Sequence, residues 1–150
     1  LSWITTLRKC ENFRKAFHKF DPEKIARYGK RDFERLMKNE GIIRSNAKIK
    51  SAIEGAQLFL DIEEKEPGGF REFIWKHVGG KPLQNKFVST KQLPAKTPMS
   101  ETLSKDLKQR GFKFCGPTII YAFCQATGMV NDHLLSCWRH KECAALAAKQ

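Results

Sequence analysis

The sequence predicts an all-α protein of about eight helices. Apolar residues recur at steps of three and four through most of the chain, which is the period of one helix face. Stretches with the alternating period of a strand are weak. The chain has 150 residues, of which 41% are hydrophobic, so it is long enough for one domain with a core. No apolar run approaches the roughly 20 residues that span a bilayer.

Four helices are predicted in the first half of the chain. Asp21-Pro22 is typical of a helix start, with proline at the first helical position. Gly29 and Gly41 mark helix ends. The fourth helix carries an apolar stripe formed by Ile49, Ile53, Ala56 and Leu60. The helices predicted here span residues 1–17, 22–29, 31–41 and 47–64.

The second half contains four more predicted helices and one long connection. Residues 79–100 are rich in Gly, Pro, Ser and Thr, and so long a connection is usually functional or wraps another element. Ser100 and Asp132 are the candidate N-caps of the helices that follow them. The helices predicted here span residues 70–78, 100–111, 118–128 and 133–149.

The charge of the chain favours a polyanionic partner. Lys and Arg number 28 against 16 Asp and Glu, which gives a net charge of +12. Such an excess suits nucleic acid. A basic domain without a polyanion is the alternative, and no strongly cationic amphipathic end segment indicates membrane-surface binding.

The cysteines do not form a disulfide pattern. Their number is odd and their spacing irregular, which favours reduced thiols of which one or two bind metal. Cys115 and Cys124 lie among apolar residues, so we interpret them as small core thiols. The five cysteines are at positions 10, 115, 124, 137 and 143.

His133 and Cys137 are candidate zinc ligands. They are four residues apart, so on a helix both side chains would project from one face. Imidazole and thiolate at that spacing can occupy two corners of a tetrahedral zinc site. His140 and Cys143 cannot complete the site on one continuous helix, because residues ten apart are roughly 15 Å apart along its axis. Two ligands are therefore missing.

The segment 37–53 is a candidate phosphate-binding hairpin. A helix ends at a glycine, an apolar turn follows, and a second helix begins among polar residues. The N-terminal end of that helix carries partial positive charge and favours phosphate. An ordinary helical hairpin capped by Ser45 or Asn46, with solvated lysines, is the alternative. The candidate DNA-backbone residues are Gly41, Arg44, Ser45, Asn46 and Lys48, with Lys50 beside them.

The segment GFKFCGP, residues 111–117, lies between two predicted helices. It holds Lys113 between two aromatic residues and either shapes a DNA-binding face or anchors the core with Phe112 and Phe114 buried. The cations of the preceding helix are weaker candidates for phosphate contacts: Lys105, Lys108 and Arg110.

Three stretches in succession resemble the DNA-3-methyladenine glycosylase I family of the helix-hairpin-helix glycosylases. They are LSWITTLRKCENFRKAFHKFDPEKI, NEGIIRSNAKIKSAIEGA and LSKDLKQRGFKFCGPTIIYAFCQATGMVNDHLLSC. The resemblance covers residues 1 to about 138, and Cys115 and Pro117 depart from it. It implies a single domain over 1–150, with a helix-hairpin-helix region at about 30–64 and a zinc-associated part at about 100–138.

The resemblance also implies roles for particular residues. Trp3 would line the pocket for the extruded base, and Leu1 would probe the gap in the duplex. His133 and Cys137 would bind a structural zinc ion. The other two ligands and a pocket glutamate would precede residue 1, so the chain is expected to be N-terminally truncated and weakly active or inactive. We identify no catalytic acid in the chain itself: Asp132 has the N-cap role, and Glu34, Glu40 and Glu54 fall on charged helix faces.

The function implied is base-excision repair, in which the enzyme flips out 3-methyladenine and hydrolyses its bond to the sugar. The expected partner is double-stranded alkylated DNA, and the protein is expected to be a cytoplasmic monomer. A non-catalytic helix-hairpin-helix DNA-binding module is the first alternative. A small zinc-stabilised interaction domain that is merely basic is the second.

Overall fold

The computed structural model describes residues 2–148 and, for Trp3, the backbone. Nine α-helices, three short 3-10 helices and two strands of two residues form within this range, which confirms the all-α prediction. No helix in these residues is long and apolar enough to cross a membrane. The chain divides into two compact units: unit 1 runs to Lys65 and includes Gly111–Phe114, and unit 2 comprises Glu66–Arg110 and the residues from Cys115 onward.

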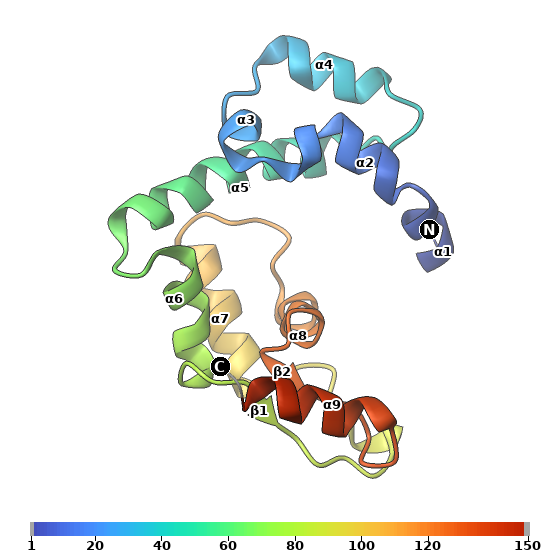
Figure 1. The fold of residues 1–150 in the computed structure, drawn as a ribbon. Helices are drawn as coiled ribbons and strands as arrows, with labels where there is room; N and C mark the ends of the chain where they lie inside the picture. The colour runs from blue at the N-terminus through green and yellow to red at the C-terminus, as the bar shows by residue number, and fades with distance from the viewer. Residues whose placement is uncertain (1, 149–150) are drawn as a thin grey trace. The chain divides into compact units, whose positions relative to one another are not determined.

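The helix predicted over residues 1–17 is broken in the structure of unit 1 (Figure 1). Lys9 ends one helix and begins the next. His18, Lys19 and Phe20 then take the left-handed conformation, with φ of 48°, 59° and 63°, which ends the helical run. The helices of unit 1 are α1 (Trp3–Arg8), α2 (Cys10–Ala16), η1 (His18–Phe20), α3 (Pro22–Ala26), α4 (Lys30–Lys38) and α5 (Asn46–Lys65).

Asp21 caps α3 as predicted. Its carboxylate accepts hydrogen bonds from the backbone N–H groups of Lys24 and Glu23, at 3.2 and 3.1 Å, and these bonds lower the pKa of Asp21. The predicted end at Gly29 is wrong, because α3 ends at Ala26. Gly29 is instead the N-cap of α4, and its N–H donates to the Asp32 carboxylate at 3.3 Å.

The core of unit 1 forms where the apolar faces of these helices meet. Leu36 of α4 is completely buried, and Ile49 and Ala56 of the predicted stripe on α5 are buried with it. Ile53 is partly buried against the same cluster. The buried residues are Ala16, Phe17, Ile25, Leu36, Ile42, Ile49 and Ala56.

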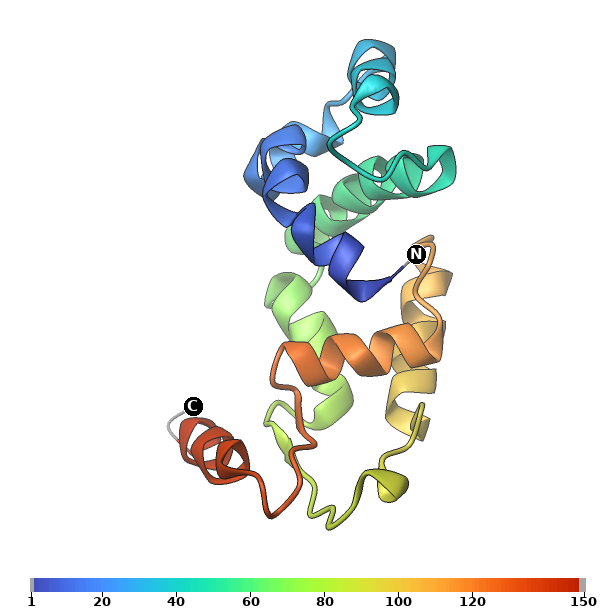
Figure 2. The same cartoon turned by 90° about the vertical axis from the view of Figure 1, so that its right-hand side faces the viewer.

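Unit 2 contains two short strands that the sequence did not indicate. Leu83 pairs with Val130 and Gln84 with Asn131, in parallel, and strands of two residues are too short to show a period. Figure 2 shows α7 and α8 crossing at a steep angle. The elements of unit 2 are α6 (Gly69–Trp75), η2 (Lys76–Val78), β1 (Leu83–Gln84), η3 (Thr90–Gln92), α7 (Pro98–Gln109), α8 (Pro117–Ala126), β2 (Val130–Asn131) and α9 (Trp138–Ala147).

Two predicted N-caps in unit 2 are wrong. Thr97, not Ser100, caps α7, and Ser100 is the third helical residue, whose hydroxyl accepts from the Thr97 N–H at 2.9 Å. The last helix begins at Trp138 rather than at residue 133, with Cys137 as its N-cap. The preceding residues are held by hydrogen bonds to β1 and its continuation, including Leu135 N–H to the Phe87 carbonyl at 2.9 Å.

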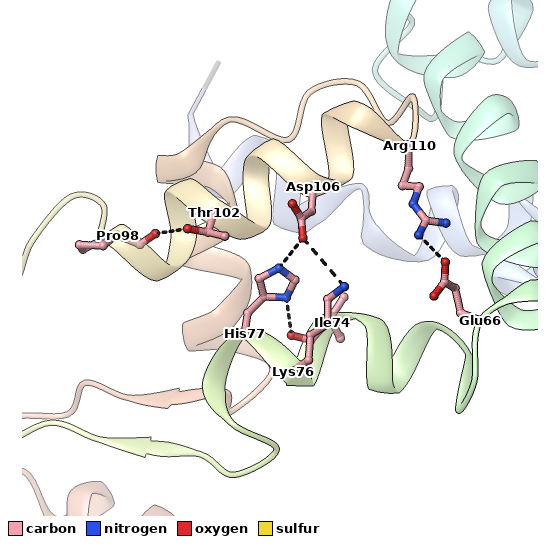
Figure 3. A network of polar contacts seen from close by, with 8 residues as sticks. All are labelled: Glu66, Ile74, Lys76, His77, Pro98, Thr102, Asp106 and Arg110. Atoms are coloured by element: carbon pink, nitrogen blue, oxygen red, sulfur yellow. Dashed lines mark hydrogen bonds and ion pairs between the residues drawn. The ribbon is translucent and has the colours of Figure 1, made fainter.

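A polar network ties η2 to α7 inside unit 2 (Figure 3). The His77 side chain is 5% exposed, and its Nε2 lies 2.9 Å from a carboxylate oxygen of Asp106. Its Nδ1 lies 3.2 Å from the Ile74 carbonyl oxygen. The Arg110 guanidinium pairs with Glu66 in the same network. These contacts fix the end of α7 that leads into the 111–116 turn.

Candidate functional site

The 39–45 turn joins α4 to α5, and side chains of unit 1 hold it. The Lys9 ammonium donates to the carbonyls of Glu40 and Gly41, at 2.9 and 3.2 Å, and the Asn12 amide donates to Gly41 at 3.1 Å. The Asn39 side chain accepts from the Gly41 N–H at 2.8 Å. A Cβ at Gly41 would lie 3.0 Å from the Asn39 side-chain oxygen, so a larger residue here would displace the Asn39 side chain slightly.

The 39–45 turn delivers the chain to the N-terminal end of α5. The Ser45 hydroxyl accepts from the Lys48 N–H at 3.5 Å, and the Ser45 carbonyl accepts from the Ile49 N–H at 2.9 Å. Ser45 therefore caps the helix, which is the cap that the ordinary-hairpin alternative expected. Arg44 and Asn46 are exposed beside it. The predicted DNA-backbone residues thus follow one another through the turn and the first turn of α5, and their binding to DNA stays a prediction.

The segment Gly111–Phe114 packs along α5. Lys113 pairs with Glu54 at 2.7 Å, and the Glu54 side chain is 45% exposed, so it stays on a solvated face as the sequence indicated and also holds this segment. Phe114 is 51% exposed and has a left-handed φ of 56°, so the interpretation that buried it is wrong. The Lys48 ammonium lies 5.9 Å from the centre of its ring.

The N-terminal end of α8 is a feature that we did not predict as a site. Its N-cap is Gly116, which offers no side chain to the first N–H groups, and Pro117 occupies the first helical position. The Gly-Pro pair is the signal that marks such an end. Lys105 and Lys108 line a hollow of about 510 Å³ beside Pro117. The Arg110 guanidinium, by contrast, pairs with Glu66 and lies over the Phe73 ring, 5.2 Å from the ring centre.

The two residues predicted to meet the damaged base are not tested by the geometry. Trp3 is the first residue of α1, and Ser2 caps that helix by accepting from the Thr5 N–H at 3.3 Å. The Trp3 side chain and all of Leu1 lie outside the described part of the chain.

His133 and Cys137 lie close together although they are not on a helix. The Cys137 sulfur is 3.9 Å from the His133 Nδ1. A tetrahedral zinc ion bound to both atoms would hold them about 3.6 Å apart, so the pair fits two corners of such a site. No group of three or more potential metal ligands occurs within residues 2–148. Zinc binding stays a prediction.

The thiols of Cys115 and Cys124 are buried. Cys124 is completely buried and Cys115 nearly so, as predicted. Burial raises the pKa of the Cys124 thiol to about 11 and also raises the pKa of Cys115. Both thiols are therefore protonated at neutral pH and are poor zinc ligands.

Asp132 has a structural role that differs from the predicted N-cap. Its carboxylate accepts hydrogen bonds from the Asn85 amide at 2.6 Å, from the Gln125 amide at 2.9 Å and from the Tyr121 hydroxyl. Burial and the hydrogen bond to Asp132 raise the pKa of Tyr121, so this hydroxyl keeps its proton and donates it. Asp132 thereby fastens the backbone next to His133. Glu34 and Glu40 are exposed, as predicted.

Comparisons with known proteins agree on one family. The family model described as methyladenine glycosylase matches residues 1–140. DNA-3-methyladenine glycosylase 1 of Escherichia coli (strain K12) is 46% identical over 138 residues, which are 91% of this chain and 73% of that protein. The DNA-3-methyladenine glycosylase of Haemophilus influenzae is 46% identical over 137 residues, which are 91% of this chain and 74% of that protein.

Solved structures give the same result. A crystal structure of 3-methyladenine DNA glycosylase I superposes with a TM-score of 0.86 at 47% identity, over 92% of this chain and 75% of that one. A variant of 3-methyladenine DNA glycosylase I in complex with 3-methyladenine also gives 0.86, at 38% identity, over 92% of this chain and 74% of that one. The sequence matches cover 91% of the chain and the fold matches cover 92%. The chain belongs to the methyladenine glycosylase family.

Proposed function

We propose that this protein is a DNA glycosylase that releases 3-methyladenine from alkylated DNA by hydrolysing the bond between base and sugar. The observation that carries the proposal is the family match over residues 1–140, with 46% identity to a glycosylase named for this base. The net charge of +12 supports DNA as the substrate.

The reaction does not require a strong catalytic acid. A purine methylated at N3 is cationic, so its bond to the sugar is already labilised and the base leaves without strong protonation. The protein must hold the nucleotide out of the duplex, at a cost of a few kcal/mol for unstacking, and admit water. We assign the stacking surface to Trp3 and the filling of the gap to Leu1. The engagement of Asp132 by three donors agrees with a reaction that does not use it.

Release of the free base tests this proposal. The protein is incubated with methylated duplex DNA, and free 3-methyladenine is measured by chromatography. Trp3→Ala should abolish release while duplex affinity changes little, because stacking on the flipped base is lost and the phosphate contacts remain. Duplex binding without release by the unaltered protein would favour the non-catalytic DNA-binding alternative.

We assign the main phosphate contacts to the N-terminal end of α5. Each phosphate neutralised lowers the slope of log affinity against log salt by about 0.9. Lys48→Gln should therefore make this slope shallower by about 0.9. Lys65→Gln is the matched control, because Lys65 lies at the other end of the same helix, roughly 26 Å along the axis from Lys48. Equal slopes for the two variants would show that Lys48 does not contact a phosphate. The N-terminal end of α8 would then be the next position to test.

We also propose that His133 and Cys137 supply two ligands to a structural zinc ion, and that the protein acts as a cytoplasmic monomer. The 3.9 Å separation of the two side chains supports the zinc ligation. Metal analysis of the purified protein should find zinc, and Cys137→Ser should lower both the zinc content and the melting temperature. An unchanged zinc content in that variant would exclude Cys137 as a ligand. Sedimentation tests the monomeric state.

A further inference from the structure

Unit 1 contains a cationic cleft whose basic residues have no role in the site described so far. It has a volume of about 590 Å³ and lies between α2, the C-terminal half of α4 and the start of the 39–45 turn. Three of its seven lining residues are cationic and none is acidic. The lining residues are Asn12, Lys15, Ala16, Arg35, Lys38, Asn39 and Gly41. For brevity we call it the α2–α4 cleft.

The cations of the α2–α4 cleft are of two kinds. Arg35 is fixed: its guanidinium donates to the Ala16 carbonyl at 3.0 Å, pairs with Asp32 at 3.4 Å and lies over the Tyr28 ring. Because a guanidinium has five N–H donors, these contacts leave donors unused. Lys15 and Lys38 are exposed and make no ion pair within residues 2–148. A fixed cation flanked by two mobile ones suits an anion with several oxygens.

The cleft is continuous with the 39–45 turn. Asn39 and Gly41 belong to both, and the Asn12 amide joins α2 to the Gly41 carbonyl at 3.1 Å. A polyanion on the N-terminal end of α5 would meet Arg44 and Gly41 and then the cleft. The required ligand therefore has phosphate groups in a row, which a nucleic-acid backbone provides and a single metabolite does not.

We infer that the α2–α4 cleft is a second phosphate-binding site, in which Lys15, Arg35 and Lys38 hold the backbone of duplex DNA next to the 39–45 turn. This inference rests on the proposed function and extends its DNA footprint. The cleft selects no sequence and touches no damaged base. It adds affinity to the complex and fixes the register of the duplex on the turn.

The salt dependence of duplex binding tests the inference. Lys15→Gln combined with Lys38→Gln should make the slope of log affinity against log salt shallower by about 1.8, since two phosphate contacts are lost. Arg35 is left unchanged because it also holds the Ala16 carbonyl. The control combines Lys30→Gln with Lys65→Gln, which removes the same charge at the opposite ends of α4 and α5. Its slope should change by less than about 0.4, because distant charges are screened.

A conservative pair completes the test. Lys15→Arg combined with Lys38→Arg keeps the charge and should keep the slope of the unaltered protein. Equal changes in the glutamine pair and its control would overturn the inference, even if the protein releases 3-methyladenine. A slope change confined to the glutamine pair, in a protein that binds DNA but releases no base, would support the cleft and reject the proposed function. A protein with no affinity for duplex DNA would overturn both.

Discussion

The two turns that precede α5 and α8 are held in place by different means. The 39–45 turn is fastened from outside, by Lys9 and Asn12, whose side chains donate to its carbonyls. The 111–116 turn is fixed by its own backbone: Gly111 has φ of 100° and Phe114 φ of 56°. The buried Ser104 hydroxyl of α7 then donates to the Cys115 carbonyl at 2.6 Å.

The difference indicates how each turn keeps its helix end accessible. In the 39–45 turn, Lys9 and Asn12 occupy the carbonyls of Glu40 and Gly41, and the Gly41 N–H is occupied by the Asn39 side chain, so the turn leads into the exposed start of α5 in a fixed conformation. The 111–116 turn is also held by the Lys113–Glu54 pair and by the Ser104 hydrogen bond, and its N-cap glycine leaves the start of α8 without a side-chain cap. The first turn therefore depends on Lys9 and Asn12, whereas the second combines left-handed backbone residues with contacts to α5 and α7.

The largest expected effect tests whether the cores of unit 1 and unit 2 are stabilised separately. Leu36 of α4 and Leu103 of α7 are both completely buried, each in a different unit. Replacing either by alanine should lower the free energy of unfolding by about 2–5 kcal/mol. Hydrogen exchange should then accelerate mainly in unit 1 for Leu36→Ala and mainly in unit 2 for Leu103→Ala. Equal acceleration throughout both variants would show that the units unfold together.

A smaller loss of stability is expected when one hydrogen bond beside each turn is removed. Ser104→Ala leaves the Cys115 carbonyl buried without its hydrogen bond, so it should cost about 1–3 kcal/mol of unfolding free energy. Ser45→Ala removes an N-cap from the partly exposed start of α5 and should cost about 1 kcal/mol. Urea denaturation of both variants measures the two values. A larger loss for Ser45→Ala would show that the Ser104 hydrogen bond stabilises the protein less than the α5 cap does.

Helices were predictable from the sequence where apolar period and capping agree. The stripe on α5, the Asp21-Pro22 start of α3 and the burial of Cys124 are all local signals, and the structure confirms each. The hairpin that carries Arg44, Ser45 and Lys48 was recognisable for the same reason: glycine, an apolar turn and a polar cap follow one another within a few residues.

The errors arise where distant residues decide the local conformation. The sequence from His133 to Cys137 has a helical pattern, yet its Leu135 N–H pairs with Phe87 and the neighbouring Asp132 is engaged by Asn85 and α8. No local pattern shows these partners. The α2–α4 cleft escaped prediction similarly, because Lys15 and Lys38 become neighbours of one cavity only through packing.

Alkaline pH should destabilise the packing of α8 more than the packing of α4 and α5. Burial raises the pKa of Cys124 from its ordinary value of 9.0 to about 11. Because the folded-state pKa is the higher one, the stabilisation is complete below pH 9 and is lost as pH rises toward 11. The loss should reach about 1–2 kcal/mol. Urea denaturation at about pH 8 and about pH 10.5 measures it, and Cys124→Ala should show a smaller difference than the unaltered protein.

The smallest expected effect compares the glycines of the two turns. Gly111 is needed for its positive φ, which alanine adopts only with strain, and a Cβ there would also lie 3.4 Å from Leu58. At Gly41 a Cβ would meet the side-chain ends of Asn39 and Asn12 at 3.0 and 3.3 Å. Side-chain ends move more readily than backbone, so Gly111→Ala should cost about 1 kcal/mol and Gly41→Ala less.

The Gly41→Ala and Gly111→Ala variants should show the opposite order in their affinity for duplex DNA. An alanine at position 41 pushes Asn12 and Asn39 away from the 39–45 turn and weakens the bond from Asn12 to the Gly41 carbonyl. Duplex affinity should then fall more for Gly41→Ala than for Gly111→Ala, although Gly41→Ala is the more stable protein. Melting curves and duplex titrations on both variants measure the two orders. If affinity followed stability instead, the support of the 39–45 turn by α2 would have no part in DNA binding.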